Sequence, residues 1–214
     1  MRTLLDLVLP AACAGCGRPG ADWCADCAAT LSGPPVRVWP RTDPGVPCWA
    51  LGPYAGPARR AVLAAKERGR RDLTTPLGAA LAGALAELRS PRLPLVLVPA
   101  PSRSIAARRR GGDPVSRSAA VAVRWLPDSQ LMTLLRLRRG TRDSVGLTPA
   151  ERARNLNGRV TTALGAAADW GIPANAEVVL VDDVLTTGAT ARESVRALER
   201  AGLPTRAVLV TCAA

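Results

Sequence analysis

The sequence predicts an α/β protein built on a parallel sheet, with a small cysteine-rich module ahead of it. From Cys48 onward, strand-like apolar runs alternate with helical patterns, which is typical of a parallel sheet covered by helices on both faces. Two Cys-x-x-Cys pairs precede this alternation, within residues 13–27. A chain of 214 residues is long enough for one such domain and a short appendage.

Changes of composition divide the chain into three stretches. Residues 1–35 hold the cysteine-rich module, residues 36–47 are rich in Pro and Gly and predict a linker, and residues 48–214 carry the α/β pattern. The opening apolar run resembles a secretory signal, but Asp6 interrupts it and Pro10 lies near the cleavage point. Because the run is also too short to cross a membrane, we expect a cytoplasmic chain with no membrane span and with reduced cysteines.

The elements expected in residues 48–214 follow one another in a regular order. In chain order, the first half of this stretch predicts an edge strand over 48–54, helices near 57–68 and 75–89, a buried strand over 93–101 and a helix near 114–125. The second half predicts a mixed segment over 131–139, a strand over 176–183, a helix over 190–201 and a strand over 205–212. A capping box from Thr148 to Glu151, with Pro149 at the first helical position, predicts one more short helix.

Four cysteines predict a zinc site in the N-terminal module. They are Cys13, Cys16, Cys24 and Cys27. Four thiolates complete a tetrahedral zinc shell, and the seven residues between the two pairs predict a compact knuckle. Two disulfides or a thioredoxin-type redox pair are the alternatives; the first needs an oxidising compartment and the second a βαβ context. The chain has no histidine, which excludes a mixed shell.

The charge balance indicates anionic partners. The sequence holds 29 Lys and Arg against 17 Asp and Glu, a formal net charge of +12, which favours polyanions or phosphorylated ligands; a solvated basic surface is the alternative. Five Trp, one Tyr and no Phe are few for a base-stacking surface, which disfavours a dedicated single-strand binder. The Gly-x4-Gly-Lys motif is absent from the sequence, which excludes an ATP-driven translocase of that type.

The stretch VVLVDDVLTTGAT, residues 178–190, holds the candidate ligand site. Asp182 and Asp183 end a predicted strand, at the edge of the sheet where ligands bind in such folds. The turn that follows offers amides, hydroxyls and a glycine to a phosphate at a helix N-terminus, through Thr186, Thr187, Gly188 and Thr190. Paired carboxylates accept hydrogen bonds from a vicinal diol. Phosphate and diol together suggest a ribose 5-phosphate; a helix cap or a solvated turn is the alternative.

This stretch resembles the ribose-phosphate signature of the type I phosphoribosyltransferases, and the chain as a whole resembles the ComF family. That family joins a cysteine-rich zinc module to a phosphoribosyltransferase-like domain. Besides the signature and the cysteines, the resemblance rests on residues 54–70, 98–114 and 144–160. It implies a type I phosphoribosyltransferase fold with a small N-terminal zinc module of four cysteine ligands.

The resemblance also implies a ligand, 5-phosphoribosyl 1-pyrophosphate with Mg²⁺. Asp182 and Asp183 would hold the ribose hydroxyls. The 5-phosphate would be held by Thr186, Thr187, Gly188, Ala189 and Thr190. The pyrophosphate side would be the loop that carries Ser102, Arg103 and Arg108 to Arg110. Lys66, the one lysine of the sequence, is a further candidate contact, with a solvated helix position as the alternative.

Departures from the family pattern concern the acceptor chemistry more than ribose-phosphate binding. Residues 111–114 are Gly-Gly-Asp-Pro where the family often has Gly-Phe-Asn-Gln, residues 142–144 are Arg-Asp-Ser where it tends to place a Gln, and Thr186 stands where some relatives use an Asp base. Residues 140–158 are expected either to close over the site, with glycine hinges, or to form a basic loop.

Two functions follow as expectations. The first is a pentosyltransferase that displaces pyrophosphate from the anomeric carbon through an oxocarbenium-like state. The alternative is a non-catalytic competence factor for DNA uptake that binds single-stranded DNA by counterion release, works with a competence helicase and uses the pocket to sense nucleotides. A salvage enzyme for a free base is a third possibility, but it needs an acceptor pocket that the sequence does not show.

Overall fold

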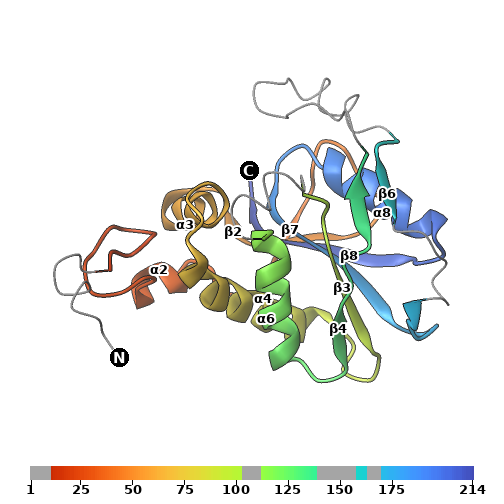
Figure 1. Cartoon of the computed structure of the whole chain (residues 1–214), viewed down its shortest axis with the longest axis horizontal. Coiled ribbons are helices and arrows are strands. Elements are labelled where there is room, and N and C mark those ends of the chain that lie inside the picture. Colours follow the sequence, from red (N-terminus) through yellow and green to blue (C-terminus); the bar gives the residue numbers. More distant parts are fainter. Residues whose placement is uncertain (1–10, 103–111, 139–157, 163–169) are drawn as a thin grey trace.

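A six-stranded sheet with the order β1-β2-β8-β7-β3-β4 forms the centre of the protein (Figure 1). The computed structural model describes residues 11–102, 112–138, 158–162 and 170–214. Neighbouring strands of the sheet run parallel except β1 and β2, which are antiparallel. Its strands are β1 (Val36–Val38), β2 (Cys48–Pro53), β3 (Leu95–Pro99), β4 (Ser129–Leu131), β7 (Glu177–Leu185) and β8 (Thr205–Ala213). The predicted α/β class with a mostly parallel sheet is therefore confirmed.

Helices cover both faces of this sheet. The remaining elements are α2 (Ala25–Ala29), α3 (Gly56–Glu67), η1 (Arg71–Leu73), α4 (Thr74–Leu88), α6 (Pro114–Trp125), α8 (Ala189–Arg200) and an antiparallel ribbon of β5 (Leu135–Leu137) and β6 (Val160–Thr162). Helices α3, α4 and α6 share one core cluster with Val179 and Val181 of β7. Helix α8 and the ribbon share another cluster with Val178 and Leu180. Alternate β7 residues thus face opposite layers, as the pleat of a strand requires.

The sheet is buried at its centre because both faces are covered. Strand β3, with the sequence Leu-Val-Leu-Val-Pro, is buried along its whole length. A continuous apolar run of this kind is what a central parallel strand needs, since neither of its faces meets water. The predicted strand over 93–101 contains β3, and the mixed segment over 131–139 contains the end of β4 and all of β5.

Helices α4 and α6 approach each other closely at Gly78. A Cβ atom at this position would lie 2.7 Å from the carbonyl oxygen of Ser118. Helix α6 begins at Pro114, and the carboxylate of Asp113 caps it by accepting the amide of Ser116 at 2.7 Å. Pro at the first helical position and Asp at the N-cap are both favourable, so these two residues define the start of α6.

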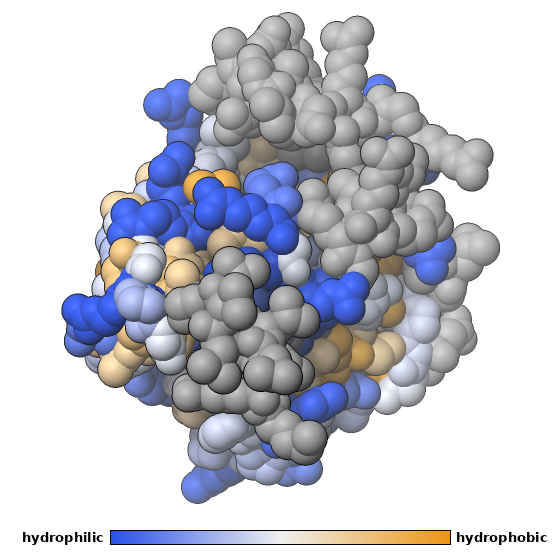
Figure 2. Space-filling view, turned by 60° about the vertical axis from the view of Figure 1, so that its left-hand side comes forward, coloured by the Kyte–Doolittle hydropathy of each residue, from blue (hydrophilic) through white to orange (hydrophobic). Residues whose placement is uncertain are grey.

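The cysteine-rich module packs against α3 and the turn that follows it. The guanidinium of Arg60 on α3 donates to the carbonyl of Gly15, in the first knuckle. Arg70 donates to the carbonyl of Ala12 at 3.2 Å and pairs with the carboxylate of Asp22 at 3.3 Å. Figure 2 turns this side of the molecule forward and shows hydrophilic side chains with apolar patches between them. The module is therefore held by Arg60 and Arg70, one before and one after Lys66 in the sequence.

The stretch expected to act as a linker, residues 36–47, contributes the edge strand β1 to the sheet. The capping box that begins at Thr148 lies outside the described residues, and so do residues 140–157 of the predicted arm. Among the described residues no helix combines the length and the apolar character that crossing a membrane requires.

Candidate functional site

The two acids of the signature lie near the end of β7, beyond the point where β3 has stopped. Strand β3 pairs with β7 as far as Pro99 opposite Val181, whose carbonyl also accepts the amide of Ala100 at 2.8 Å. Strands β7 and β8 then continue side by side to their ends. Asp182 and Asp183 therefore lie on a step at the carboxyl edge of the sheet, the edge at which ligands bind in open parallel sheets.

Lys66 reaches the acid pair from the last turn of α3. Its Nζ lies 2.7 Å from Oδ2 of Asp183, and the carboxylate of Asp183 is mostly buried. Burial opposes the charge of Lys66, but the nearby carboxylate of Asp183 outweighs it, so the pKa of Lys66 lies above its ordinary value. Lys66 thus contacts the acid pair, while its side chain remains partly exposed to solvent.

Asp182 differs from an ordinary surface carboxyl in its readiness to ionise. Burial and the neighbouring charge of Asp183 raise the pKa of Asp182 to about 8, although Lys66 and the amide of Asp183 act in the opposite direction. That amide donates to Oδ1 of Asp182 at 2.8 Å. A bound cation or hydroxyl donor would favour ionisation of Asp182.

The turn after β7 leads directly into the N-terminus of α8. Gly188 is the N-cap of this helix and has a left-handed backbone with φ of 85°, a conformation that glycine adopts without strain. The amide of Ala189 lies 3.4 Å from the hydroxyl oxygen of Thr187. Thr186 is exposed, while Thr187 and Thr190 are half-buried. Amides at a helix N-terminus and nearby hydroxyls form a suitable cradle for a phosphate.

Residues 40–42 pack against this turn. The sequence did not indicate this contact. The amide of Thr42 donates to the carbonyl of Thr187 at 2.8 Å. A Cβ atom on Gly188 would collide with the carbonyl oxygen of Thr42 and would come within 2.8 Å of Cβ of Pro40. A Pro- and Gly-rich composition predicts an irregular path but carries no signal for the contacts that the path makes.

The described ends of the loop after β3 are residues 100–102 and 112–113. Ser102 is exposed there, three residues after the end of β3, and Asp113 marks the start of α6 on the other side of the loop. The charge of Asp113 contributes to the raised pKa of Asp182, so the two carboxyls belong to one region. Arg103 and Arg108, predicted on the pyrophosphate side with Arg109 and Arg110, lie outside the described residues.

Hollows in the described surface differ in size and in distance from the acids. The one that touches both Asp182 and Asp183 has a volume of only about 20 Å³ and continues down between α3, α4 and α6, which is room for about one water molecule. A sugar phosphate would therefore lie above the step at the sheet edge rather than inside the core.

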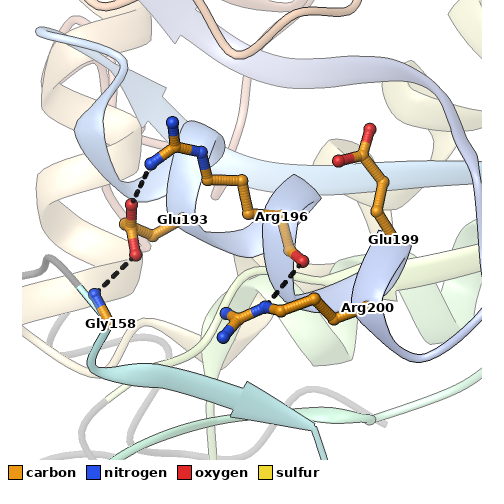
Figure 3. A pocket seen from close by; sticks show the side chains of 5 residues that line it. All are labelled: Gly158, Glu193, Arg196, Glu199 and Arg200. Atoms are coloured by element: carbon orange, nitrogen blue, oxygen red, sulfur yellow. Dashed lines mark hydrogen bonds and ion pairs between the residues drawn. The ribbon is translucent and has the colours of Figure 1, made fainter.

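A larger hollow of about 500 Å³ lies along α8 (Figure 3). There the buried carboxylate of Glu193 accepts the amide of Gly158 at 2.7 Å and lies 3.3 Å from the guanidinium of Arg196, while Arg200 donates to the carbonyl of Arg196 at 3.1 Å. These contacts tie the residues just before β6 to α8. Of the charged side chains that line the hollow, Glu193, Arg196 and Arg200 thus already have partners.

The four cysteines of the module are brought together as predicted. Their sulfur atoms all lie within 4.8 Å of one another, and Sγ of Cys24 lies 3.6 Å from that of Cys13 and 3.7 Å from that of Cys16. Zinc–sulfur bonds of about 2.3 Å in a tetrahedron place the ligand sulfurs about 3.8 Å apart. The cluster could therefore bind one structural metal ion such as zinc.

The thiols of this cluster are not equivalent. Burial opposes ionisation of Cys13, but amide donors from Cys24, Cys16 and Gly15 outweigh it and lower the pKa of Cys13 to about 6. Burial and neighbouring thiols raise the pKa of Cys27. Gly15 is required in the knuckle because a Cβ atom there would lie 2.6 Å from the sulfur of Cys27. The backbone thus provides donors to a thiolate before any metal is considered.

Comparisons with known proteins add no relative. No protein-family model matches the chain, and a search of curated proteins finds no match. The candidate site is therefore interpreted from its own residues.

Proposed function

We propose that the chain has a type I phosphoribosyltransferase fold and binds 5-phosphoribosyl 1-pyrophosphate with Mg²⁺ at the end of β7. One observation carries the proposal: on a single step of the sheet edge, two acids precede a turn closed by a left-handed glycine and the N-terminus of α8, and Lys66 reaches the second acid. Anion-binding and diol-binding groups are thus found in the order that a ribose 5-phosphate requires.

In the proposed complex each part of the site meets one part of the ligand. Asp182 and Asp183 accept hydrogen bonds from the two ribose hydroxyls, and Lys66 holds the carboxylate of Asp183 in place. The turn and the first residues of α8 hold the 5-phosphate, through Thr186, Thr187, Gly188, Ala189 and Thr190. The loop after β3, with Ser102, faces the pyrophosphate.

The proposed reaction is phosphoribosyl transfer to a nucleophile. The bond between the anomeric carbon and the pyrophosphate oxygen breaks, pyrophosphate departs with the electron pair, and the nucleophile bonds to that carbon and loses its proton. Asp182 and Asp183 contribute by fixing the ribose ring while positive charge develops next to it. Mg²⁺, bound mainly by ligand oxygens, supplies neutralisation of the leaving group.

For the cysteine cluster we propose Zn²⁺ as a structural ion. Support comes from the all-sulfur donor set, from the sulfur separations, and from the closed shell that four protein ligands leave to a tetrahedral ion. A closed shell has no open position for a substrate, so the cluster stabilises the module that packs against α3.

Calorimetry on the metal-loaded protein tests the ligand proposal. We expect 5-phosphoribosyl 1-pyrophosphate with Mg²⁺ to bind the wild type, and Asp183→Asn to weaken binding about 30-fold, because losing a charged acceptor costs about 2 kcal/mol. Asp128→Asn is the matched control, since it removes the same charge from an exposed turn. Absence of binding to folded wild type, or equal losses in both variants, would overturn the proposal.

The second candidate is a non-catalytic factor that binds single-stranded DNA, with a competence helicase as its partner. The formal net charge of +12 favours it because phosphate neutralisation releases counterions. The double variant Asp182→Asn with Asp183→Asn separates the two functions. It should abolish sugar-phosphate binding and leave salt-dependent DNA affinity unchanged; if both are lost together, the two functions share one site.

A further inference from the structure

Three side chains form a stack at the open edge of the sheet. Arg37 of β1 lies opposite Trp49 of β2 in the antiparallel pairing, and its guanidinium lies over the Trp49 ring, 5.4 Å from the ring centre. The same guanidinium lies over the ring of Trp39, at 5.8 Å. Both separations fall within the range of cation–π contacts. The guanidinium of Arg37 thus contacts both indole rings.

Trp39 ends this stack and is left open to solvent. It is 80% exposed, whereas Trp49 is half-buried and packs against the core. Beside it lies a hollow of about 430 Å³ whose lining includes Arg37, Trp39, Pro40 and Asp43. This volume falls in the usual range of sites for small organic ligands, about 300–1,000 Å³. A mostly exposed ring beside a hollow leaves surface on which a further planar group can stack.

The charge at this hollow is suited to a nucleotide. Nε of Arg37 is buried and has no hydrogen-bond partner within the described parts of the chain, although a buried donor normally has one. Asp43 supplies an acceptor from the same hollow. Indole and guanidinium planes are the groups on which nucleobases stack in proteins, and a formal net charge of +12 attracts the phosphates that accompany such bases.

The stack is joined to the candidate phosphate turn by the chain itself. Trp39 is followed immediately by Pro40, which packs against Gly188, and by Thr42, whose amide donates to Thr187. Residues 40–42 therefore connect Trp39 along the chain to the turn that begins α8.

A protein partner fits this surface less well. Strand β1 is an exposed edge, but it is only three residues long and carries Arg37 at its centre, and short edges with charged residues are poor templates for adding a strand. Trp125, the other large exposed aromatic of the described residues, lies at the end of α6 and is 67% exposed. The cation–π contacts found in the described part of the chain do not include its ring, which makes Trp125 a suitable control.

We propose that Trp39, supported by Arg37 and Trp49, is a stacking site for a nucleobase. The site differs from the sugar-phosphate site at Asp182 and Asp183 and does not depend on phosphoribosyl transfer. The sparse aromatics of the sequence disfavour an extended stacking surface, and the structure instead provides one supported ring. The base can come from a single nucleic acid strand or from a free nucleotide, and the experiment separates these sources.

The test combines a substitution in the protein, Trp39→Ala, with removal of the bases from the oligonucleotide. Affinity of the full, metal-loaded chain is measured by fluorescence anisotropy with a labelled oligothymidine of about 15 nucleotides, within the site sizes known for single-strand binders, and with an abasic strand that has the same number of phosphates. We expect Trp39→Ala to weaken binding of oligothymidine about tenfold, since one stacked base contributes about 1–3 kcal/mol. On the abasic strand the same substitution should change nothing, because no base is present to stack.

Control variants test whether the loss of affinity is due to the aromatic ring of Trp39. Trp39→Phe should restore most of the affinity, and Trp125→Ala should leave it unchanged. The dependence of affinity on salt should be the same for Trp39→Ala and the wild type, because no phosphate contact is removed. Far-ultraviolet circular dichroism confirms that each variant is folded before its affinity is compared.

Competition with thymidine monophosphate identifies the source of the base. If the mononucleotide displaces the strand from the wild type and not from Trp39→Ala, the site takes a free nucleotide; if it does not displace the strand while Trp39→Ala weakens binding of oligothymidine alone, the site takes a base within a strand. Equal affinities of wild type and Trp39→Ala for oligothymidine would overturn the proposal. So would equal effects of the substitution on both strands, or a change of oligomeric state in sedimentation without loss of binding.

Discussion

The cysteine module and the end of β7 both gather groups that become negatively charged, but they arrange them differently. In the module, four sulfurs lie within 4.8 Å of one another, at separations that suit a single metal ion. At the end of β7, a lysine from α3 lies 2.7 Å from Asp183. The cysteine cluster can take up a metal ion from solution, whereas the acid pair already contacts Lys66, a cation of the protein itself.

The two regions also differ in which parts of the fold bring their residues together. The four cysteines lie within fifteen residues of one another, from Cys13 to Cys27, so local turns alone can assemble them. The acid pair is placed by β7 and its neighbours in the sheet, and α3 adds Lys66 to it. Helix α3 is itself tied to the module through Arg60 and Gly15. Because the module also holds the candidate metal site, substitutions there should have the larger effect on stability.

Removal of the metal is expected to have the largest effect. Cys24→Ser removes the ligand whose sulfur lies 3.6 and 3.7 Å from two others. Because the free energy of binding a structural zinc ion is also folding free energy, we expect the melting temperature to fall by about 10 °C or more. Mass spectrometry of metal content and thermal melts with and without a chelator check this. Cys48→Ala, which alters a buried sulfur outside the cluster, is the control and should retain the metal.

Gly188→Ala is expected to have the next largest effect. The substitution places a Cβ atom against Thr42 and Pro40 and strains a backbone with φ of 85°, which we expect to lower the free energy of unfolding by about 3 kcal/mol. Gly202→Ala is a close control, since φ is 79° there and no atom lies within 4 Å of the added Cβ. It should cost only about 1 kcal/mol. Equal losses in urea unfolding would mean that the contact with residues 40–42 does not constrain the turn before α8.

The sequence predicted the parts of both regions that lie close together along the chain. The cysteine spacing predicted a four-sulfur cluster, and the apolar run before Asp182 predicted a strand, although β7 continues two residues beyond Asp183 to Leu185. The salt bridge from Lys66 was beyond prediction, because it joins residues 117 positions apart through the packing of α3. The support that Pro40 and Thr42 give to the turn has no sequence signal either, since prolines and glycines predict only where regular structure stops.

Lys66→Met removes the ammonium group that contacts the acid pair, and it measures how much that contact stabilises the protein. Lys66 is 44% exposed, so solvent screens its ion pair, and we expect a loss of about 1 kcal/mol in the free energy of unfolding. Combining it with Asp183→Asn gives a double-mutant cycle in which the coupling between the two residues is measured by urea unfolding. Arg68→Met, at the exposed end of the same helix, is the control. A coupling of zero would show that the pair contributes nothing to stability.

The smallest effect, and the most direct test of the acid pair, is its pH dependence. Burial raises the pKa of Asp182 to about 8, above its value in the unfolded chain, so the folded state holds a proton that the unfolded state releases between about pH 4 and pH 8. Stability from this group is therefore greatest at low pH and declines as pH rises to about 8. We expect a decline of about 1 kcal/mol, reduced by screening at a partly exposed strand end.

Asp182→Asn removes the group that titrates and should flatten that part of the profile. The raised pKa of Lys66 contributes stability that is lost only above its ordinary range, so it does not affect a series of urea unfolding measurements from about pH 5 to pH 8.5. Ligand binding should change in the opposite direction: the ionised carboxyl accepts hydroxyl donors, so affinity for the sugar phosphate should rise with pH over the same interval. Wild-type profiles identical to those of the variant in both measurements would mean that Asp182 does not titrate over this interval, which would contradict the pKa of about 8.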